Sequence, residues 1–265
     1  MIYSLTASHY DCKIKGLLLK FAIESLIKIG VDKCFVSMSF NDKTHYAKYK
    51  YIISELEKIY PQLKIYIHLE KMFQFQHLEF LSKNIEKIVN LDDKIIFCDD
   101  DDIILKLPDI TKSDIICGYH WITDFVENDI SNFNNYQSIT KIIENNDKSK
   151  WRKEIDFGGY ICPYKLLKDF FHEKKIDYTD KSQLNIMYLQ LIDCKFMKFL
   201  DSKKSYKPDV PFCYHRIWQT KDRNIQLWRQ NYMNLPKINT DNYKKKILFL
   251  LGFSIILLFG YKKIL

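Results

Sequence analysis

The sequence predicts an α/β protein whose central sheet is mostly parallel and flanked by helices. The chain opens with an apolar segment at Ile2–Leu5, a helically spaced segment at Leu17–Ile29 and a second apolar segment at Cys34–Phe40. A β-α-β order of this kind favours parallel strands joined by a right-handed crossover. Later, the short apolar run Ile95–Cys98 leads directly into four consecutive aspartates, which is typical of a buried strand that ends at a polar loop.

The other elements follow in order along the chain. Gly30 comes directly after the first helical segment, where a glycine commonly ends a helix. Tyr46–Tyr60 has a helical pattern, and Leu63–Ile67 reads as a third strand. A further helix is expected from Gln74 to about Val89, and a further strand at Asp114–Tyr119. Residues 124–150 are polar, rich in asparagine and without periodicity, so we expect a long loop there.

Composition limits the possible functions. The 265 residues are enough for one large α/β domain or two small ones. The net charge of +8 comes from lysines that are spread along the chain without a nucleic-acid-binding motif, so we expect no nucleic-acid partner. Attraction to phosphate-bearing donors or to anionic membrane surfaces explains the charge equally well. The seven cysteines include no CxxC pair, and their odd number without an amino-terminal signal segment favours a reducing compartment.

The acidic run Asp99–Asp102 is the most informative stretch. It follows a predicted strand, and ligands bind at the carboxyl ends of strands in open α/β sheets. Adjacent carboxylates repel one another unless a cation or hydrogen-bond donors offset their charge. Such a density of hard oxygen ligands suits Mg²⁺ or Mn²⁺, with a phosphate as shared partner. The alternative is an acidic turn in which one aspartate caps a helix, but the apolar residues on both sides favour a ligand site.

This stretch resembles the DxD signature of GT-A glycosyltransferases, which use nucleotide-sugar donors. Asp99, Asp101 and Asp102 match the signature, and Asp100 takes its variable place. The resemblance implies a GT-A-like domain over residues 1–235 that moves a sugar from a nucleoside-diphosphate sugar to a hydroxyl of a glycan, lipid or protein acceptor. It implies that Asp99 faces the ribose or the metal and that Asp101 and Asp102 hold Mn²⁺ or Mg²⁺. Asp100 would lie beside them in the donor site.

The first strand and helix extend the resemblance. Residues 22–26 read Ala-Ile-Glu-Ser-Leu and match an Ala-Ile-x-Ser-Leu pattern of the family. The resemblance implies that Leu5, Thr6 and Asp42 line the nucleoside pocket. The alternative is that Thr6 and Asp42 are simply turn residues at strand ends.

Two later segments are further candidates for donor contacts. His77 and Lys83 lie where related proteins place a donor-contacting polar or basic residue, although both would also suit the surface of a helix. Gly158 and Gly159 precede an apolar segment and a proline, as in a Gly-Gly segment of many GT-A proteins where donor and acceptor meet. Paired glycines permit positive φ and close approach of backbone to a ligand, but a tight turn into an edge strand is the alternative.

Three residues near the end of the predicted domain complete the expected site. Asp180 precedes a helical pattern and suits an N-cap, and the resemblance implies that it is the general base of an inverting reaction. The family commonly has two adjacent acids there, whereas this chain has Thr179 and Asp180. His215 would complete the metal shell, and Arg216 would bind diphosphate oxygens. A structural role for His215 is the alternative.

The carboxyl-terminal residues predict membrane association. A basic linker at 236–246 precedes an uncharged apolar run at 247–261, and two lysines follow. A helix of this length spans about 22 Å, short of the ~30 Å hydrocarbon core, but flanking lysines can snorkel and the bilayer can thin. A single-helix membrane anchor is the first interpretation, with the catalytic domain facing the cytosol. A membrane-surface helix and a buried core helix are the alternatives.

Two other functions use the same features. A nucleotidyl- or phosphotransferase would employ the same arrangement of acids, metal and phosphate. A non-catalytic, membrane-tethered binding module would retain the fold without turnover.

Overall fold

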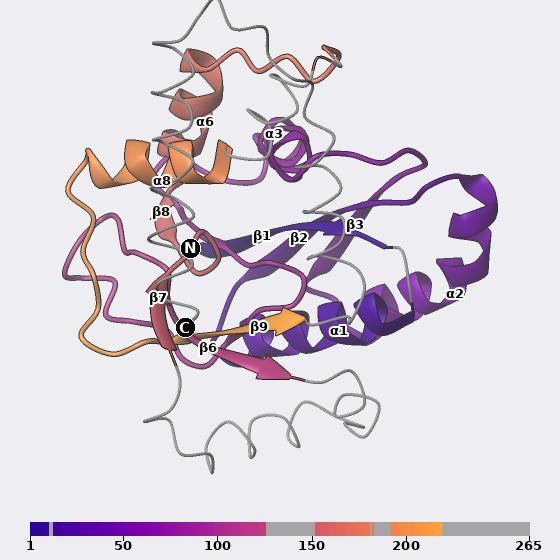
Figure 1. Ribbon diagram of the computed structural model, residues 1–265, viewed down its shortest axis with the longest axis horizontal. Helices are drawn as coiled ribbons and strands as arrows, with labels where there is room; N and C mark the ends of the chain where they lie inside the picture. The colour runs from indigo at the N-terminus through magenta and orange to yellow at the C-terminus, as the bar shows by residue number, and fades with distance from the viewer. Residues whose placement is uncertain (11–12, 126–151, 181, 183–191, 219–265) are drawn as a thin grey trace, which may run out of the picture. The chain divides into compact units, whose positions relative to one another are not determined.

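The computed structural model describes residues 1–10, 13–125, 152–180, 182 and 192–218 (Figure 1). The chain divides into two units, and all of these residues belong to the first, Met1–Trp218. The predicted basic linker, the apolar run at 247–261, the domain end at 235 and most of the expected loop at 124–150 lie outside the described residues. In the part of the chain that is described, no helix is long and apolar enough to cross a membrane.

A five-stranded sheet forms the centre of the molecule and confirms the prediction of a mostly parallel sheet. Its strand order is β3-β2-β1-β4-β8, in which the first four strands are parallel and β8 is antiparallel to β4. The strands are β1 (Ile2–His9), β2 (Lys33–Ser39), β3 (Leu63–His68), β4 (Lys94–Phe97) and β8 (Ile161–Pro163). The first strand is longer than predicted, because Thr6–His9 continue the pairing with β2 instead of turning away.

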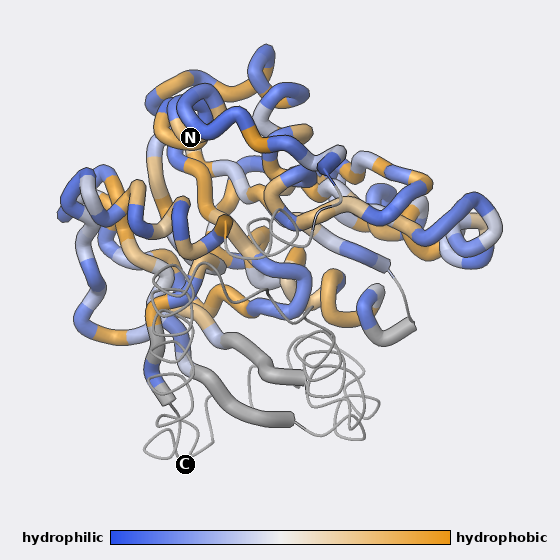
Figure 2. Tube along the Cα trace, turned by 45° about the horizontal axis from the view of Figure 1, so that its top comes forward, coloured by the Kyte–Doolittle hydropathy of each residue, from blue (hydrophilic) through white to orange (hydrophobic). Residues whose placement is uncertain are grey.

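Helices cover both faces of this sheet (Figure 1). Apolar residues of α1 (Lys13–Lys28) and α2 (Lys43–Ile59) pack on one face. Those of α3 (Gln74–Asn84), α6 (Tyr164–Glu173) and α8 (Ile192–Asp201) pack on the other. Figure 2 shows hydrophobic stretches gathered in the middle of the described trace and hydrophilic stretches toward its outside. The sheet is therefore buried on both faces, as its nearly continuous apolar strands require.

The end of α1 agrees with the sequence-based prediction, whereas the end of α3 does not. Gly30 has φ +86°, and the amide of Val31 donates to the carbonyl of Leu26 at 3.1 Å, so the prediction that α1 ends at this glycine is confirmed. In contrast, α3 ends at Asn84 and not near Val89. Ile85 caps the helix, and the amide of Ile88 donates to its carbonyl in a tighter turn.

A second, four-stranded sheet was not predicted from the sequence. It has the order β5-β9-β6-β7 and consists of β5 (Ile103–Ile104), β6 (Tyr119–Phe125), β7 (Arg152–Ile155) and β9 (Cys213–Trp218). The strand expected at 114–119 is wrong, because β6 only begins at Tyr119. Before it, Ile116 makes isolated bridges to Ile161 and Tyr206.

Candidate functional site

The strand order reverses direction next to β1. The chain passes from β1 to β2 to β3 on one side, and β4 then pairs with the other side of β1. In an open α/β sheet, ligands bind outside the carboxyl ends of the strands at this point of reversal. The amide of Cys98 still donates to the carbonyl of Leu5 at 3.1 Å, so the acidic run begins beside the last residues of β1. The topology therefore places the four aspartates where the sequence predicted a ligand site.

The four aspartates form a tight turn, which we call the acid turn (Asp99–Asp102). The amide of Asp102 donates to the carbonyl of Asp99 at 3.1 Å and closes the turn. Asp99 and Asp101 are half-buried, whereas Asp100 and Asp102 are buried, with 6% and 0% of their surface exposed. The consecutive side chains therefore do not share one environment, and their contacts differ accordingly.

Asp99 connects the acid turn to α3. The side-chain amide of Gln74, the first residue of α3, donates to Asp99 Oδ1 at 2.8 Å. Because α3 begins beyond β3, this contact crosses the carboxyl ends of the central strands. Gln74 was not predicted as a site residue, although its place as the first residue of the expected helix was a usable signal.

Asp100 connects the acid turn to β1 and α1. The hydroxyl of Ser8 donates to Asp100 Oδ2 at 2.7 Å, and the ammonium of Lys15 lies 2.7 Å from Asp100 Oδ1. Both carboxylate oxygens thus have protein partners, although the sequence placed Asp100 in the donor site. Neither partner was predicted. Ser8 follows Thr6-Ala7 at the strand end, but nothing in the sequence separates Lys15 from the many other lysines.

Asp102 is enclosed by the glycine pair that the sequence assigned to ligand contact. A Cβ added at Gly158 would collide with Asp102 Oδ2, and a ring carbon of His120 would lie 3.3 Å from the same position. His120 is fully buried and hydrogen-bonded to the carbonyl of Gly158. Asp102 is therefore an interior carboxylate, and its expected place in a metal shell stays a prediction. The close approach predicted for Gly158 is made to Asp102 instead.

Neighbouring groups respond to the buried charge of Asp102. Burial raises the pKa of the Cys98 and Cys213 thiols well above the ordinary value, and the negative charge of Asp102 raises both further. Gly159 has φ +77°, and an added Cβ would collide with the sulfur of Cys213. The glycine pair is thus required by dense packing beneath the acid turn.

The expected metal shell is not assembled by the described side chains. Among them, no group of three or more histidine, cysteine, aspartate or glutamate residues is placed to hold a metal ion. Asp99 is held by Gln74 at the start of α3, whereas Asp102 is enclosed beside Gly158 and His120, so these two expected ligands have different surroundings. His215 and Arg216 lie on β9, opposite Ile122 and Thr123 of β6, but their side chains lie outside the described part. Their predicted roles, and that of Asp101, stay predictions.

Five side chains at the same edge of the sheet form a second polar arrangement, which we call the histidine chain (His9, Ser39, His77, Ser37, His68). Ser39 Oγ lies 2.9 Å from His9 Nδ1 and 3.1 Å from His77 Nε2. Ser37 Oγ lies 2.8 Å from both His77 Nδ1 and His68 Nε2. The chain thus runs across the carboxyl ends of β1, β2 and β3 and includes one residue of α3.

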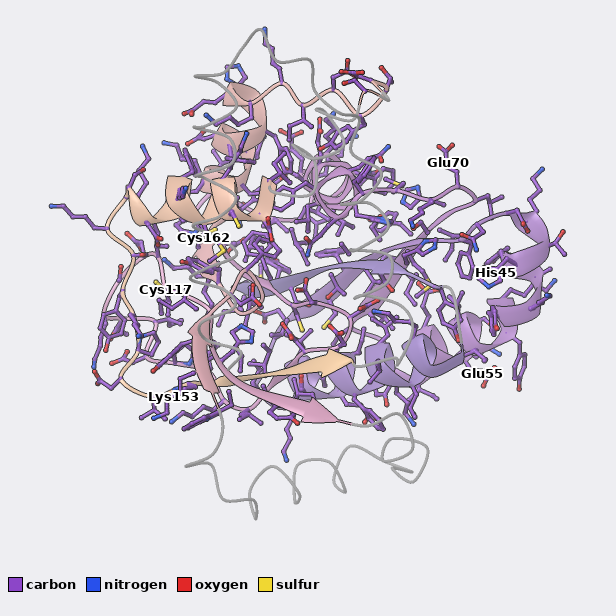
Figure 3. All side chains as sticks on the ribbon, in the orientation of Figure 1. His45, Glu55, Glu70, Cys117, Lys153 and Cys162 are labelled. Atoms are coloured by element: carbon purple, nitrogen blue, oxygen red, sulfur yellow. The ribbon has the colours of Figure 1, made fainter. Side chains whose placement is uncertain are left out.

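His77 is the centre of this arrangement. It is 1% exposed, so it does not lie on a helix surface, and its contact with a donor stays a prediction. Burial first, and then the neighbouring His68 and His9, lower its pKa to about 3. Burial also lowers the pKa of His68, which the charge of Glu70 opposes. Figure 3 labels Glu70 beyond the end of β3. His77 is therefore a neutral ring that hydrogen-bonds two serines.

The remaining donor-side candidates lie in less favourable places. Lys83 is exposed near the end of α3, where its ammonium is 2.6 Å from Glu79 Oε1, far along the helix from the acid turn. Leu5 is 1% exposed and lies in the core, paired with Phe35 and Phe97. The pocket-lining role of Leu5 and the donor contact of Lys83 stay predictions.

The alternative reading of Thr6 and Asp42 was that both are turn residues at strand ends. The structure agrees with it for Asp42 but not for Thr6. Thr6 is buried within β1, opposite Val36, and is not a turn residue. Asp42 is exposed and caps α2, because its Oδ1 accepts the amide of His45 at 2.7 Å. A nucleoside contact by Asp42 stays a prediction, whereas its capping role is sufficient to explain its position.

Asp180 lies on an exposed segment after α6. Its carboxylate accepts the amide of Ser182 at 2.8 Å and the hydroxyl of Ser182 at 2.9 Å. Nearby, Asp177 accepts the amide and the hydroxyl of Thr179. The helix expected at residues 182–191 lies outside the described part except for Ser182. The assignment of Asp180 as general base is therefore untested and stays a prediction.

Comparison with known proteins gives likeness at the level of the fold. No protein-family model and no curated protein sequence matches the chain. Similar solved structures include TarS 1-349 of S. aureus, with 15% identity over 82% of this chain and a TM-score of 0.44. HddC of Yersinia pseudotuberculosis has 19% identity over 69% of this chain and a TM-score of 0.38. GalNAc-T7, solved with UDP, GalNAc and Mn²⁺, has 12% identity over 92% of this chain and a TM-score of 0.49.

These matches include GT-A glycosyltransferases, in agreement with the resemblance predicted from the sequence. The chain spans 60% of the TarS structure, 87% of HddC and 49% of GalNAc-T7. The identities of 12–19% and the TM-scores of 0.38–0.49 describe a likeness of overall fold alone.

Proposed function

We propose that this protein is a glycosyltransferase that moves a sugar from a nucleoside-diphosphate sugar to an acceptor hydroxyl. The observation that supports this most directly is the position of the acid turn. It follows β4 beside the carboxyl end of β1, where the strand order reverses and where α/β sheets bind nucleotides. Asp99 and Asp101 are its half-buried members, whereas Asp100 and Asp102 are buried.

The residues of the chain would act mainly by binding and orientation. Asp99, held by Gln74, is placed to accept hydroxyl groups of a ribose, since an ionised carboxylate is a strong acceptor. Asp180 is the candidate base that would take the proton of the acceptor hydroxyl. Metal dependence rests on the sequence resemblance, and we assign no step to a metal ion. Membrane association through residues 247–261 likewise rests on the sequence.

The test is nucleotide binding by the full-length protein. Thermal unfolding would be followed with UDP, GDP and CMP, each with and without Mn²⁺, for the wild type, Asp101→Asn and Asp92→Asn. Asp92 is the matched control, because it is an exposed aspartate that precedes β4. A ligand at 100 times its Kd stabilises by about 2.7 kcal/mol, which corresponds to a shift of several degrees for a domain of this size. We expect one nucleotide to shift the wild type and Asp92→Asn, and the shift to be lost in Asp101→Asn.

The same preparations separate the alternatives. Release of the sugar from a UDP- or GDP-sugar supports glycosyl transfer, whereas consumption of a nucleoside triphosphate favours a nucleotidyl- or phosphotransferase. A shift that requires Mn²⁺ would support the predicted metal dependence. If none of the nucleotides shifts the wild type, the acid turn is not a nucleotide site and the proposal is wrong.

A further inference from the structure

Lys15 brings a positive charge to the acid turn. It lies in the first turn of α1, and its ammonium is 2.7 Å from Asp100 Oδ1. The side chain of Lys15 remains 28% exposed, whereas that of Asp100 is 9% exposed. The pair thus has a buried end at the carboxylate and a more accessible end at the lysine.

Asp100 itself is in a poor position to bind a ligand. Ser8 donates to one of its oxygens and Lys15 to the other, each at 2.7 Å. The carboxylate is buried, and each of its two oxygens already accepts a hydrogen bond from the protein, so little of it is open to a ligand. Its contacts instead fix the ammonium of Lys15 at one place, between the end of β1 and the acid turn.

An anionic ligand needs such a cation at this edge. Four consecutive carboxylates repel a phosphate unless a positive charge offsets them. An ammonium has three donor hydrogens, so the contact with Asp100 does not exhaust its capacity to donate. Lysine binds phosphate as a compact point charge on a flexible stem, and its partial exposure allows contact with a ligand above the strand ends.

We propose that Lys15 is a phosphate-binding residue of this site and that Asp100 is the residue that positions it. The ligand group is a phosphate oxygen of a nucleoside diphosphate. The proposal rests on the proposed function for the identity of the nucleotide, but the phosphate contact itself can be tested without it. A merely structural ion pair between Lys15 and Asp100 is the competing explanation.

The experiment measures binding to the full-length protein by calorimetry. The probes are UDP, GDP, uridine, guanosine and inorganic pyrophosphate. The variants are Lys15→Met, Lys15→Arg and the double variant Lys15→Met with Asp100→Asn. Lys20→Met is the matched control, because Lys20 is on the same helix and its ammonium lies 3.8 Å from Glu24 Oε1 in a half-buried pair.

We expect Lys15→Met to weaken binding of the diphosphate at least tenfold, to leave binding of the matching nucleoside unchanged, and to differ from Lys15→Arg, which keeps the charge. Lys20→Met should behave as the wild type. The double variant removes both charges and so avoids leaving a buried carboxylate without its partner. It should still bind the diphosphate weakly, whereas a merely structural ion pair predicts that it recovers wild-type binding.

The outcomes distinguish the two proposals. Diphosphate binding that Lys15→Met leaves unchanged, or that the double variant recovers, overturns the role of Lys15 and leaves the glycosyltransferase proposal standing. Absence of nucleotide binding, with pyrophosphate bound by the wild type and lost in Lys15→Met, supports the phosphate contact and overturns the glycosyltransferase. If the wild type binds neither the nucleotides nor pyrophosphate, both proposals are wrong.

Discussion

The acid turn and the histidine chain lie at the carboxyl edge of the same sheet, but they are built in opposite ways. The acid turn consists of four neighbours in sequence whose side chains contact different parts of the fold, through Gln74 for Asp99, through Ser8 and Lys15 for Asp100, and beneath Gly158 for Asp102. The histidine chain instead gathers residues that are distant in sequence into one continuous hydrogen-bonded path.

Strand register explains the difference. His9 pairs with Ser39, and Ser39 pairs with His68, so the last residues of three parallel strands lie side by side. Residues directly paired across parallel strands direct their side chains to the same face of the sheet. Consecutive residues of a tight turn have no such common direction. Adjacency in sequence is therefore a weak guide to a shared site, and equivalent places on neighbouring strands are a better one.

The largest effect on stability is expected at His77, where a substitution interrupts the histidine chain but leaves the acid turn unchanged in sequence. Replacement by leucine removes the hydrogen bonds to Ser37 and Ser39 inside the protein, and buried polar groups left without partners cost about 1–3 kcal/mol each. We expect His77→Leu to lower the free energy of unfolding by about 2–4 kcal/mol. Urea unfolding at neutral pH measures this change in the free energy of unfolding. His172→Leu, at an exposed position on α6, is the control and should change little.

The same residue makes stability depend on pH. Its folded pKa of about 3 lies below the ordinary value of 6.5, so the unfolded chain binds a proton that the folded protein does not. The contribution of the neutral His77 ring to the free energy of unfolding is complete above pH 6.5 and is lost progressively as the pH falls toward 3. We expect His77→Gln to lose less stability than the wild type between pH 7 and pH 5. Equal losses in both proteins would contradict a neutral, buried ring.

A smaller effect is expected beneath the acid turn. Gly158→Ala places a methyl group against Asp102 Oδ2, and overpacking of this kind costs about 1–3 kcal/mol. The cost should come from contact and not from backbone conformation, because Gly158 is not among the glycines with positive φ. Gly30→Ala tests the opposite case, since its surroundings are open but its φ is +86°. Denaturant unfolding of both variants, with nucleotide binding measured alongside, would show whether only Gly158→Ala disturbs the site.

The smallest expected effect is at Asp42, at the end of β2 and outside both arrangements. Asp42→Ala removes the N-cap of α2 and should lower the free energy of unfolding by about 1 kcal/mol. Asp42→Ser keeps a capping oxygen and should restore most of that stability. If Asp42 also contacts the nucleoside, as the sequence resemblance implies, both variants would weaken UDP or GDP binding equally. Unchanged binding would leave capping as its whole role.

Much of the central fold could be predicted from local patterns. The β-α-β opening, the end of α1 at Gly30 and the strand before the acid turn each depend on periodicity or on one residue type, and these expectations agree with the structure. The second sheet could not be predicted, because its strands pair across large gaps in sequence. Its strand β6, for example, lies between β7 and β9. Pairings of this kind leave no local pattern in the chain.

The sequence by itself determined that four carboxylates follow a buried strand at the carboxyl edge of a parallel sheet, since composition and periodicity suffice for that conclusion. Only the tertiary structure decided where each carboxylate points, that Lys15 accompanies Asp100, and that His77 is enclosed with two serines. The physical reason is the distance along the chain between the residues that are in contact. Periodicity reflects contacts within one element, whereas the partner of a buried charge or ring is set by the packing of several elements against one another.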